Sequence, residues 1–190
     1  VLANREIAQT LNAIKAAGGQ AQYVAADVTN SSNVSAAVAP ITKELGEVTG
    51  IIHGAGVLAD KFIEQKTLEE FNAVYTTKID GLLSLLAATN TKNVKHLVLF
   101  SSAAGFYGNP GQSDYSIAND ILNKTAYRFK ALNPTAQVLS FNCCLLYTYD
   151  AADEADSVEL GVCSISKQKR NKQTVEIART RGRTPSGTID

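Results

Sequence analysis

The sequence has 190 residues, of which 45% are hydrophobic and 19% are charged, and this composition is ordinary for one globular domain. Its 18 basic and 18 acidic residues cancel, so charge gives no reason to expect a nucleic acid or a membrane as a partner. No apolar run approaches the roughly 20 residues of a membrane-spanning helix, and the N-terminus lacks a signal-peptide pattern, so we expect a cytoplasmic protein.

The first part of the chain predicts helices alternating with strands. Apolar residues at helical spacing indicate a helix over 4–17, which Gly18-Gly19 would end. Residues 22–26 predict a short buried strand, and the apolar positions between 34 and 45 predict another helix. Gly50–His53 predicts the next strand.

The alternation continues to about residue 142. Residues 68–88 predict a long helix, 96–100 a strand, 113–132 a helix and 138–141 a strand. The strand over 96–100 is apolar almost without alternation, which is typical of a parallel sheet covered on both faces. Strands and helices that alternate on this scale indicate an α/β fold with a doubly wound parallel sheet.

Polar or glycine residues follow three of these strands, namely Asp27, Gly54–Gly56 and Ser101-Ser102. Ligands of open α/β sheets bind beyond the carboxyl ends of the strands, so we expect these three strand ends to line one crevice. Glycine lets the backbone approach a ligand closely, although Gly54–Gly56 could also be a tight turn. Asp27 could equally be a turn or capping residue.

Four side chains suit the reduction of a carbonyl by a nicotinamide cofactor: Lys78, Ser102, Tyr115 and Asn119. The reaction needs a proton donor, a second hydrogen bond to the substrate oxygen, and a cation, because a phenol with a pKa near ~10 is a poor acid at neutral pH. Tyr115 would be the acid, Ser102 would hold the oxygen, and Lys78 would lower the pKa of Tyr115. Taken alone, the tyrosine would be an ordinary half-buried helix residue and the lysine a solvated one.

The segment 14–142 resembles the ketoreductase domain of polyketide and polyunsaturated fatty acid synthases, within the short-chain dehydrogenase/reductase superfamily. Two stretches carry the resemblance, Gly50–Gly56 and Gly105–Tyr115. In that family Lys comes from the preceding long helix and Asn follows the Tyr by four residues, as Lys78 and Asn119 do here. The family's first strand and glycine-rich loop have no counterpart, so the resemblance implies an incomplete Rossmann-like fold without the first βα unit.

This resemblance implies NADPH-dependent reduction of a 3-oxoacyl thioester that an acyl carrier protein carries, in a chain with other synthase domains. It also implies that Asn119 orders a water molecule that relays protons. The cofactor contacts that it implies are at Asp27, Val28, Gly54, Ala55, Gly56, Lys78 and Tyr115. Leu58-Ala59-Asp60 partly resembles an element linked to a D-configured 3-hydroxyl product. No metal, nucleic acid or membrane is implied, and we assign His53 no catalytic role.

Two other functions stay open at this point. The chain could be a catalytically inactive fragment or a structural subdomain of such a synthase. It could also be a sugar-nucleotide epimerase or dehydratase on the same fold, although those enzymes keep Lys at the position of Asn119.

The C-terminal part departs from this pattern, so we divide the chain into a ketoreductase-like domain over 1–142 and an atypical tail over 143–190. All three cysteines lie in the tail, without the spacing of a metal site or a disulfide framework. Basic residues cluster between 167 and 183 without interleaved aromatic residues, so we expect a disordered or artefactual tail in preference to one that binds nucleic acid or a carrier protein. The sequence contains no Met, so we expect that it is a fragment.

Overall fold

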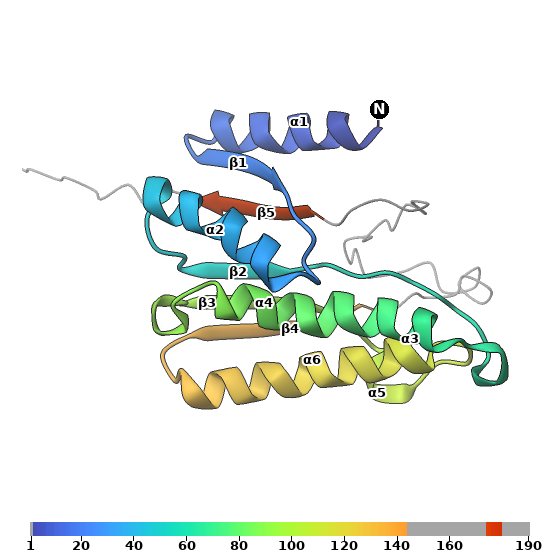
Figure 1. The fold of residues 1–190 in the computed structure, drawn as a ribbon. Coiled ribbons are helices and arrows are strands. Elements are labelled where there is room, and N and C mark those ends of the chain that lie inside the picture. Colours follow the sequence, from blue (N-terminus) through green and yellow to red (C-terminus); the bar gives the residue numbers. More distant parts are fainter. Residues whose placement is uncertain (1, 144–173, 180–190) are drawn as a thin grey trace, which may run out of the picture.

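The structure, a computed structural model, describes residues 2–143 and 174–179 of the chain. The elements up to residue 143 follow the order that the sequence predicts (Figure 1). The N-terminal elements are α1 (Leu2–Ala16), β1 (Gln20–Ala25), α2 (Ser31–Leu45) and β2 (Gly50–His53). The later ones are β3 (His96–Ser102), a short α5 (Ala104–Tyr107), α6 (Ser113–Leu132), β4 (Gln137–Cys143) and β5 (Thr174–Arg179). Two short 3-10 turns, η1 (Ile63–Gln65) and η3 (Thr91–Asn93), lie in the connections.

The segment predicted as one helix over 68–88 is helical, but a π-helical turn interrupts it. Its parts are α3 (Leu68–Tyr75), the π turn η2 (Thr76–Asp80) and α4 (Gly81–Ala87). A capping box begins α3, because the side chains of Thr67 and Glu70 each accept a hydrogen bond from the backbone N–H of the other. In η2 the backbone N–H of Gly81 reaches five residues back to the carbonyl of Thr76. Such turns occur frequently at functional sites.

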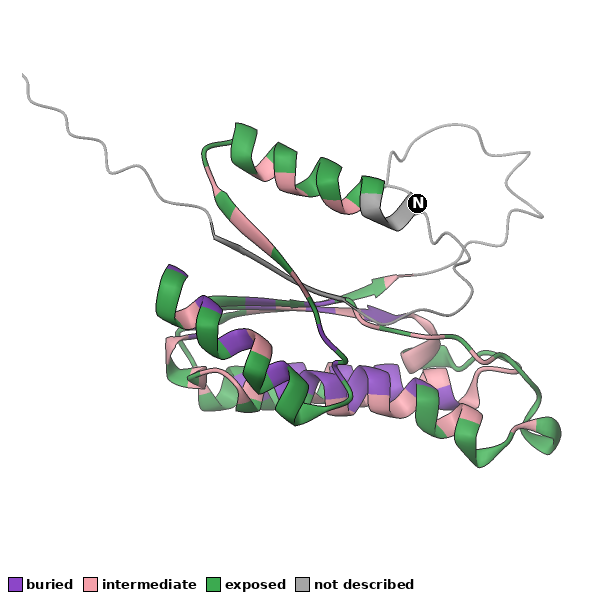
Figure 2. Cartoon of the chain, turned by 45° about the horizontal axis from the view of Figure 1, so that its top comes forward, coloured by how far each residue is buried: buried purple, intermediate pink, exposed green. Residues whose placement is uncertain are grey.

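A parallel sheet in the order β2-β3-β4 organises the molecule, with His53 opposite Leu99 and Leu99 opposite Ser140. One face of this sheet packs on helices, and Ile51, Leu97 and Leu99 are buried there. Helices α2, α4 and α6 complete the core with Val34, Val38, Leu82, Leu85, Ala118, Leu122, Ala126 and Phe129. Figure 2 shows these buried residues gathered between the helices and the sheet.

The expectation that helices cover both faces of this sheet is wrong for the described residues. On the face opposite the core, Ile52 is 70% exposed, Leu139 is 48% exposed and Phe141 is 45% exposed. The apolar character of β3 therefore reflects one packed face and one partly exposed face. It does not require a second helical layer.

Strand β1 also differs from the expected buried strand. It pairs antiparallel with β5, so that Gln20 lies opposite Arg179, and it is not hydrogen-bonded to the three-stranded sheet. None of its residues is buried, and Tyr23 is 38% exposed. Helix α1 packs beside β1 and exposes most of its surface (Figure 2). The rest of the predicted tail, 144–173 and 180–190, lies outside the described residues.

Candidate active site

Lys78 lies in the π turn and points its amine toward the end of β3. Its Nζ donates a hydrogen bond to the carbonyl of Phe100 at 3.1 Å and lies 5.2 Å from the centroid of the Tyr115 ring. A Cβ on Gly56 would stand 3.4 Å from Lys78 Cε and 3.5 Å from Nζ, so the glycine backbone lies directly beside the amine. Lys78 is 4% exposed. The structure thus brings together a cation, a phenol and a glycine loop from three separate elements.

His53 fixes the backbone of this lysine, a role that the sequence did not reveal. Its Nε2 lies 2.8 Å from the carbonyl oxygen of Lys78, and because a carbonyl can only accept, Nε2 must donate. The ring is 2% exposed, and burial lowers the pKa of His53 from its ordinary 6.5 to about 4. His53 is therefore neutral near pH 7. Gly81 leaves space for it, since a Cβ there would lie 3.5 Å from His53 Cε1.

Burial also acts on the ionisation of Lys78 itself. Desolvation lowers the pKa of its ammonium from the ordinary 10.5 to about 8, opposed by a charge interaction with Cys143. Much of the lysine population remains protonated at neutral pH. Its proton nevertheless leaves far more readily than that of a solvated lysine.

Ser102 ends β3 beside the first turn of α6, which carries Tyr115. The Ser102 hydroxyl donates to the carbonyl of Cys143 at 3.1 Å and accepts from the backbone N–H of Ala104 at 3.2 Å. The parallel register places Ser102 opposite Cys143 at the end of β4. The hydroxyl is thus held at the carboxyl end of the sheet, where the sequence placed it.

The pKa of Tyr115 moves in the direction opposite to the one expected from the sequence. Burial raises it above its ordinary value of 10, while hydrogen bonds with the side chains of Ser102 and Asn119 lower it. Lys78 is not among the groups that lower it. The pKa of Lys78, about 8, lies below that of the phenol, so the amine has lost most of its charge before Tyr115 titrates, although it is largely protonated at neutral pH.

Asn119 lies one turn after Tyr115 and is completely buried. Its Nδ2 donates to the carbonyl of Tyr115 at 2.8 Å, and its own backbone carbonyl accepts from the Ser101 hydroxyl at 3.1 Å. Its Oδ1 has no hydrogen-bond partner among the described residues. A buried acceptor of this kind is costly unless something donates to it, which suits a residue that binds a water molecule.

The residues after β1 form a turn. The exposed Asp27 accepts hydrogen bonds at Oδ1 from the backbone N–H of Thr29 at 2.9 Å and from its hydroxyl at 2.7 Å. This is the turn geometry left open as an alternative. Val28 is 1% exposed as a whole residue, and its Cγ2 would stand 3.1 Å from a Cβ on Gly81, so its side chain packs inward. This turn nevertheless lies near His53, because Val28 and His53 both lie beside Gly81.

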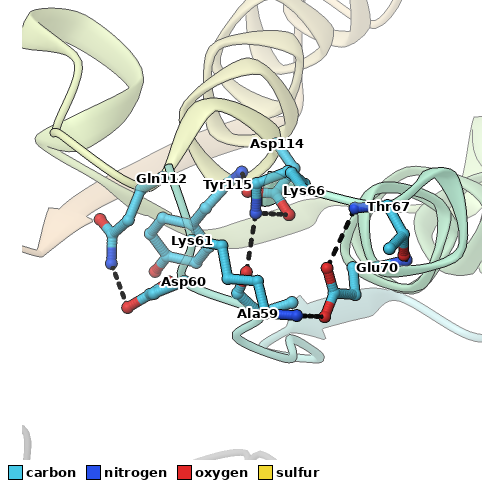
Figure 3. A network of polar contacts seen from close by, with 9 residues as sticks. All are labelled: Ala59, Asp60, Lys61, Lys66, Thr67, Glu70, Gln112, Asp114 and Tyr115. Atoms are coloured by element: carbon cyan, nitrogen blue, oxygen red, sulfur yellow. Dashed lines mark hydrogen bonds and ion pairs between the residues drawn. The ribbon is translucent and has the colours of Figure 1, made fainter. Parts of the chain in front are cut away.

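The sequence also missed a polar network around Tyr115 (Figure 3). Lys66 and Asp114 form a buried ion pair directly before the tyrosine, and Gln112 Nε2 donates to Asp60 Oδ2 at 2.9 Å. Asp114 lies within Gly105–Tyr115, one of the two stretches that carry the family resemblance, so the sequence already marked this position for attention. Nothing around Lys66 in the sequence indicates a partner 48 residues away.

Within 2–143 and 174–179, no three His, Cys, Asp or Glu side chains are placed to hold a metal ion. No helix within these ranges has both the length and the apolar character needed to cross a membrane.

The chain is similar to known proteins over the segment that carries this site. The family described as "KR domain" matches residues 2–145. A polyunsaturated fatty acid synthase of Thraustochytrium sp. is 50% identical over 125 residues, which are 65% of this chain and 4% of the synthase polypeptide. The polyketide synthase PksN of Bacillus subtilis is 34% identical over 136 residues, which are 70% of this chain and 2% of the synthase.

A solved structure is similar in fold and sequence over this segment. The crystal structure of an N-terminal ketoreductase from a macrolactin assembly line has a TM-score of 0.67 and 34% sequence identity, and the match covers 74% of this chain and 29% of that one. The chain therefore spans less than a third of this ketoreductase, and a few per cent of the curated relatives above.

Proposed function

Because this chain belongs to the KR domain family, we propose that it reduces a 3-oxoacyl thioester to the 3-hydroxyacyl thioester with NADPH. The observation that carries the proposal is the grouping of Lys78, Ser102 and Tyr115. The lysine amine lies 5.2 Å from the centroid of the phenol ring, and burial raises the pKa of Tyr115 while the side chain of Ser102 lowers it.

The side chains divide the work of carbonyl reduction between them. Tyr115, which burial keeps protonated at neutral pH, donates its proton to the substrate oxygen. The Ser102 hydroxyl holds that oxygen, and protonated Lys78 stabilises the phenolate that the tyrosine leaves behind. Asn119 binds a water molecule at its unpartnered Oδ1 and so offers a route by which Tyr115 regains a proton.

The residues present suit a nicotinamide cofactor. Gly54 and Gly56 are exposed and carry no side chain, and Gly56 lies beside the Lys78 amine, so backbone and ammonium together can contact ribose hydroxyls. Ala55, the Asp27-Val28 turn and Tyr115 complete the set of residues that would hold the cofactor. The bound cofactor supplies the hydride.

The same family membership supports a proposal for the substrate and the partners. The matched relatives are synthases many times longer than this chain, which favours a domain that works beside other synthase domains. We propose that an acyl carrier protein presents the 3-oxoacyl thioester. The epimerase alternative is disfavoured by the family match.

Substitution of Tyr115 tests this function. We expect Tyr115→Phe to lower the rate of NADPH oxidation with a 3-oxoacyl thioester by about 100- to 10,000-fold, because it removes the proton donor. The measurement is loss of absorbance at the nicotinamide band, with the protein expressed from the whole gene that contains this sequence.

The matched control is Tyr127→Phe, since Tyr127 lies on the same helix and is 80% exposed. It should leave the rate unchanged. If Tyr115→Phe kept full activity, the tyrosine would not be the acid. If the unsubstituted protein oxidised no NADPH, the inactive subdomain would be the better description.

A further inference from the structure

A buried ion pair joins the loop after β2 to the helix that carries Tyr115. Lys66 Nζ donates to Asp114 Oδ2 at 2.8 Å and to the carbonyl of Ala59 at 2.7 Å. The lysine side chain is 4% exposed and the aspartate side chain 0%. Lys66 therefore makes one hydrogen bond within its own loop, to Ala59, and a second contact that holds this loop against α6, to Asp114.

Asp114 connects this pair to the backbone of the tyrosine. Its Oδ1 accepts a hydrogen bond from the backbone N–H of Tyr115 at 2.9 Å. The first N–H groups of a helix have no partner within it, and Gln112, at the start of α6, supplies no side-chain cap. Both oxygens of the Asp114 carboxylate are thus engaged, one with the loop and one with the residue that carries the phenol.

Two further hydrogen bonds attach the same loop to the residues just before α6. The backbone N–H of Lys61 donates to the carbonyl of Gly111 at 2.9 Å, and Gln112 donates to Asp60. Figure 3 shows the ring of Tyr115 lying alongside the part of the loop that carries Asp60. The charge of Asp60 acts on the phenol, so the position of the loop is part of the environment of the reacting hydroxyl.

A buried ion pair adds little net stability to a fold, because the desolvation of two charges offsets their attraction. What it supplies is a fixed geometry with strong directional hydrogen bonds. Here that geometry links residues 59–66 to the first turn of α6 and to the backbone N–H of Tyr115.

We propose that Lys66 and Asp114 are positioning residues, which hold the loop 57–66 and Tyr115 in one fixed arrangement for proton transfer. This inference rests on the proposed reduction. In it the pair does not touch the reacting atoms. It acts through the tyrosine backbone and through the loop beside the ring.

The test replaces the ion pair by a neutral pair of similar shape, Lys66→Met with Asp114→Asn, in the full-length protein. The asparagine keeps an acceptor for the Tyr115 N–H. We expect kcat to fall about tenfold or more, since small misplacements of catalytic groups have large effects on rate, while KM for NADPH stays within about twofold. Hydrogen exchange of residues 57–66 should become faster.

The matched control is Lys124→Met with Asp120→Asn, an exposed ion pair on the same helix. It should change neither kcat nor exchange in the loop. Asp114→Asn alone has one acceptor oxygen for two donors, Lys66 Nζ and the Tyr115 N–H, and leaves a buried ammonium without its counter-charge, so it should lose at least as much kcat as the double variant.

Equal behaviour of the two double variants would overturn the inference, and so would loss of folding in both Asp114 variants, because the pair would then be structural. If the unsubstituted protein oxidised no NADPH, the proposed function would fail. The exchange measurement would still decide whether the pair holds the loop.

Discussion

His53 illustrates how a buried neutral side chain can set the position of a charged one. It donates to the Lys78 carbonyl from the end of β2. A hydrogen bond to the carbonyl fixes the backbone of the π turn without touching the amine. The sequence led us to assign His53 no catalytic role, and it could not predict this contact because the partner is a backbone atom 25 residues away.

The lowered pKa of His53 predicts a specific acid sensitivity. Between pH 6.5 and about 4 the unfolded chain binds a proton at His53 and the folded chain does not. Stability is therefore complete above pH 6.5 and falls as pH drops, by at most about 1.4 kcal/mol per pH unit. Urea unfolding at pH 7 and pH 4.5 measures this loss.

His53→Gln provides the comparison, since the glutamine amide can donate to the Lys78 carbonyl but does not titrate. We expect the variant to lose less stability than the unsubstituted protein between these two pH values. Identical losses would mean that His53 is protonated in the folded state. All other groups are the same in both proteins, so the difference between their losses of stability reports on His53.

At the residue scale, the catalytic set could be predicted because its members share a pattern of residue types and spacing. The structure places Lys78, Ser102, Tyr115 and Asn119 together. The pKa direction of Tyr115 could not be predicted, since it depends on how deeply the ring is buried and on where the amine lies relative to the hydroxyl.

Among the elements, the contact between α5 and α6 is the tightest backbone approach near the site. A Cβ on Gly105 would lie 2.8 Å from the backbone N of Asp120 and 2.9 Å from both C and Cβ of Asn119. Neither backbone group can move aside cheaply. We therefore expect Gly105→Ala to destabilise the fold by about 1–3 kcal/mol and to shift Asn119.

Thermal and urea unfolding measure this change, and Gly50→Ala is the control. A Cβ on Gly50 would meet its nearest neighbours in His96 at 3.7 Å and 3.8 Å, which is ordinary contact. This variant should be neutral or should gain up to about 1 kcal/mol, because glycine in a strand is entropically unfavourable. A neutral Gly105→Ala would show that α5 can move away from α6.

The type and order of the elements up to residue 143 followed from hydrophobic periodicity, and their bounds agree closely. The π turn did not follow, because the apolar spacing over 68–88 is compatible with an uninterrupted helix. The antiparallel pairing of β1 with β5 also escaped prediction. It joins residues 149 to 159 positions apart in sequence, from Ala25 with Thr174 to Gln20 with Arg179.

For the molecule as a whole, the one-sided packing of the parallel sheet makes adjacent residues unequal. Ile51 is 7% exposed and faces the core, whereas Ile52 is 70% exposed. We expect Ile51→Thr to cost about 2–4 kcal/mol, because it buries a hydroxyl and removes packed carbon. Ile52→Thr should change stability by no more than about 0.5 kcal/mol.

The two variants are each other's control, since they make the same chemical change one residue apart in β2. Urea unfolding gives the stability, and the binding of a hydrophobic dye reports the exposed face. Ile52→Thr should reduce dye binding. Equal losses of stability would mean that both faces of the sheet are covered.

The π turn has one more consequence, which concerns insertions and deletions. Val74 and Leu82 are eight residues apart and both face inward, whereas a regular helix returns to the same face after about seven residues, so the π turn accommodates one extra residue. Removing one residue of 76–80 other than Lys78 would therefore let the segment close into a regular helix with both side chains still buried. A gene shortened in this way would encode a protein that folds but no longer holds the ammonium over the phenol.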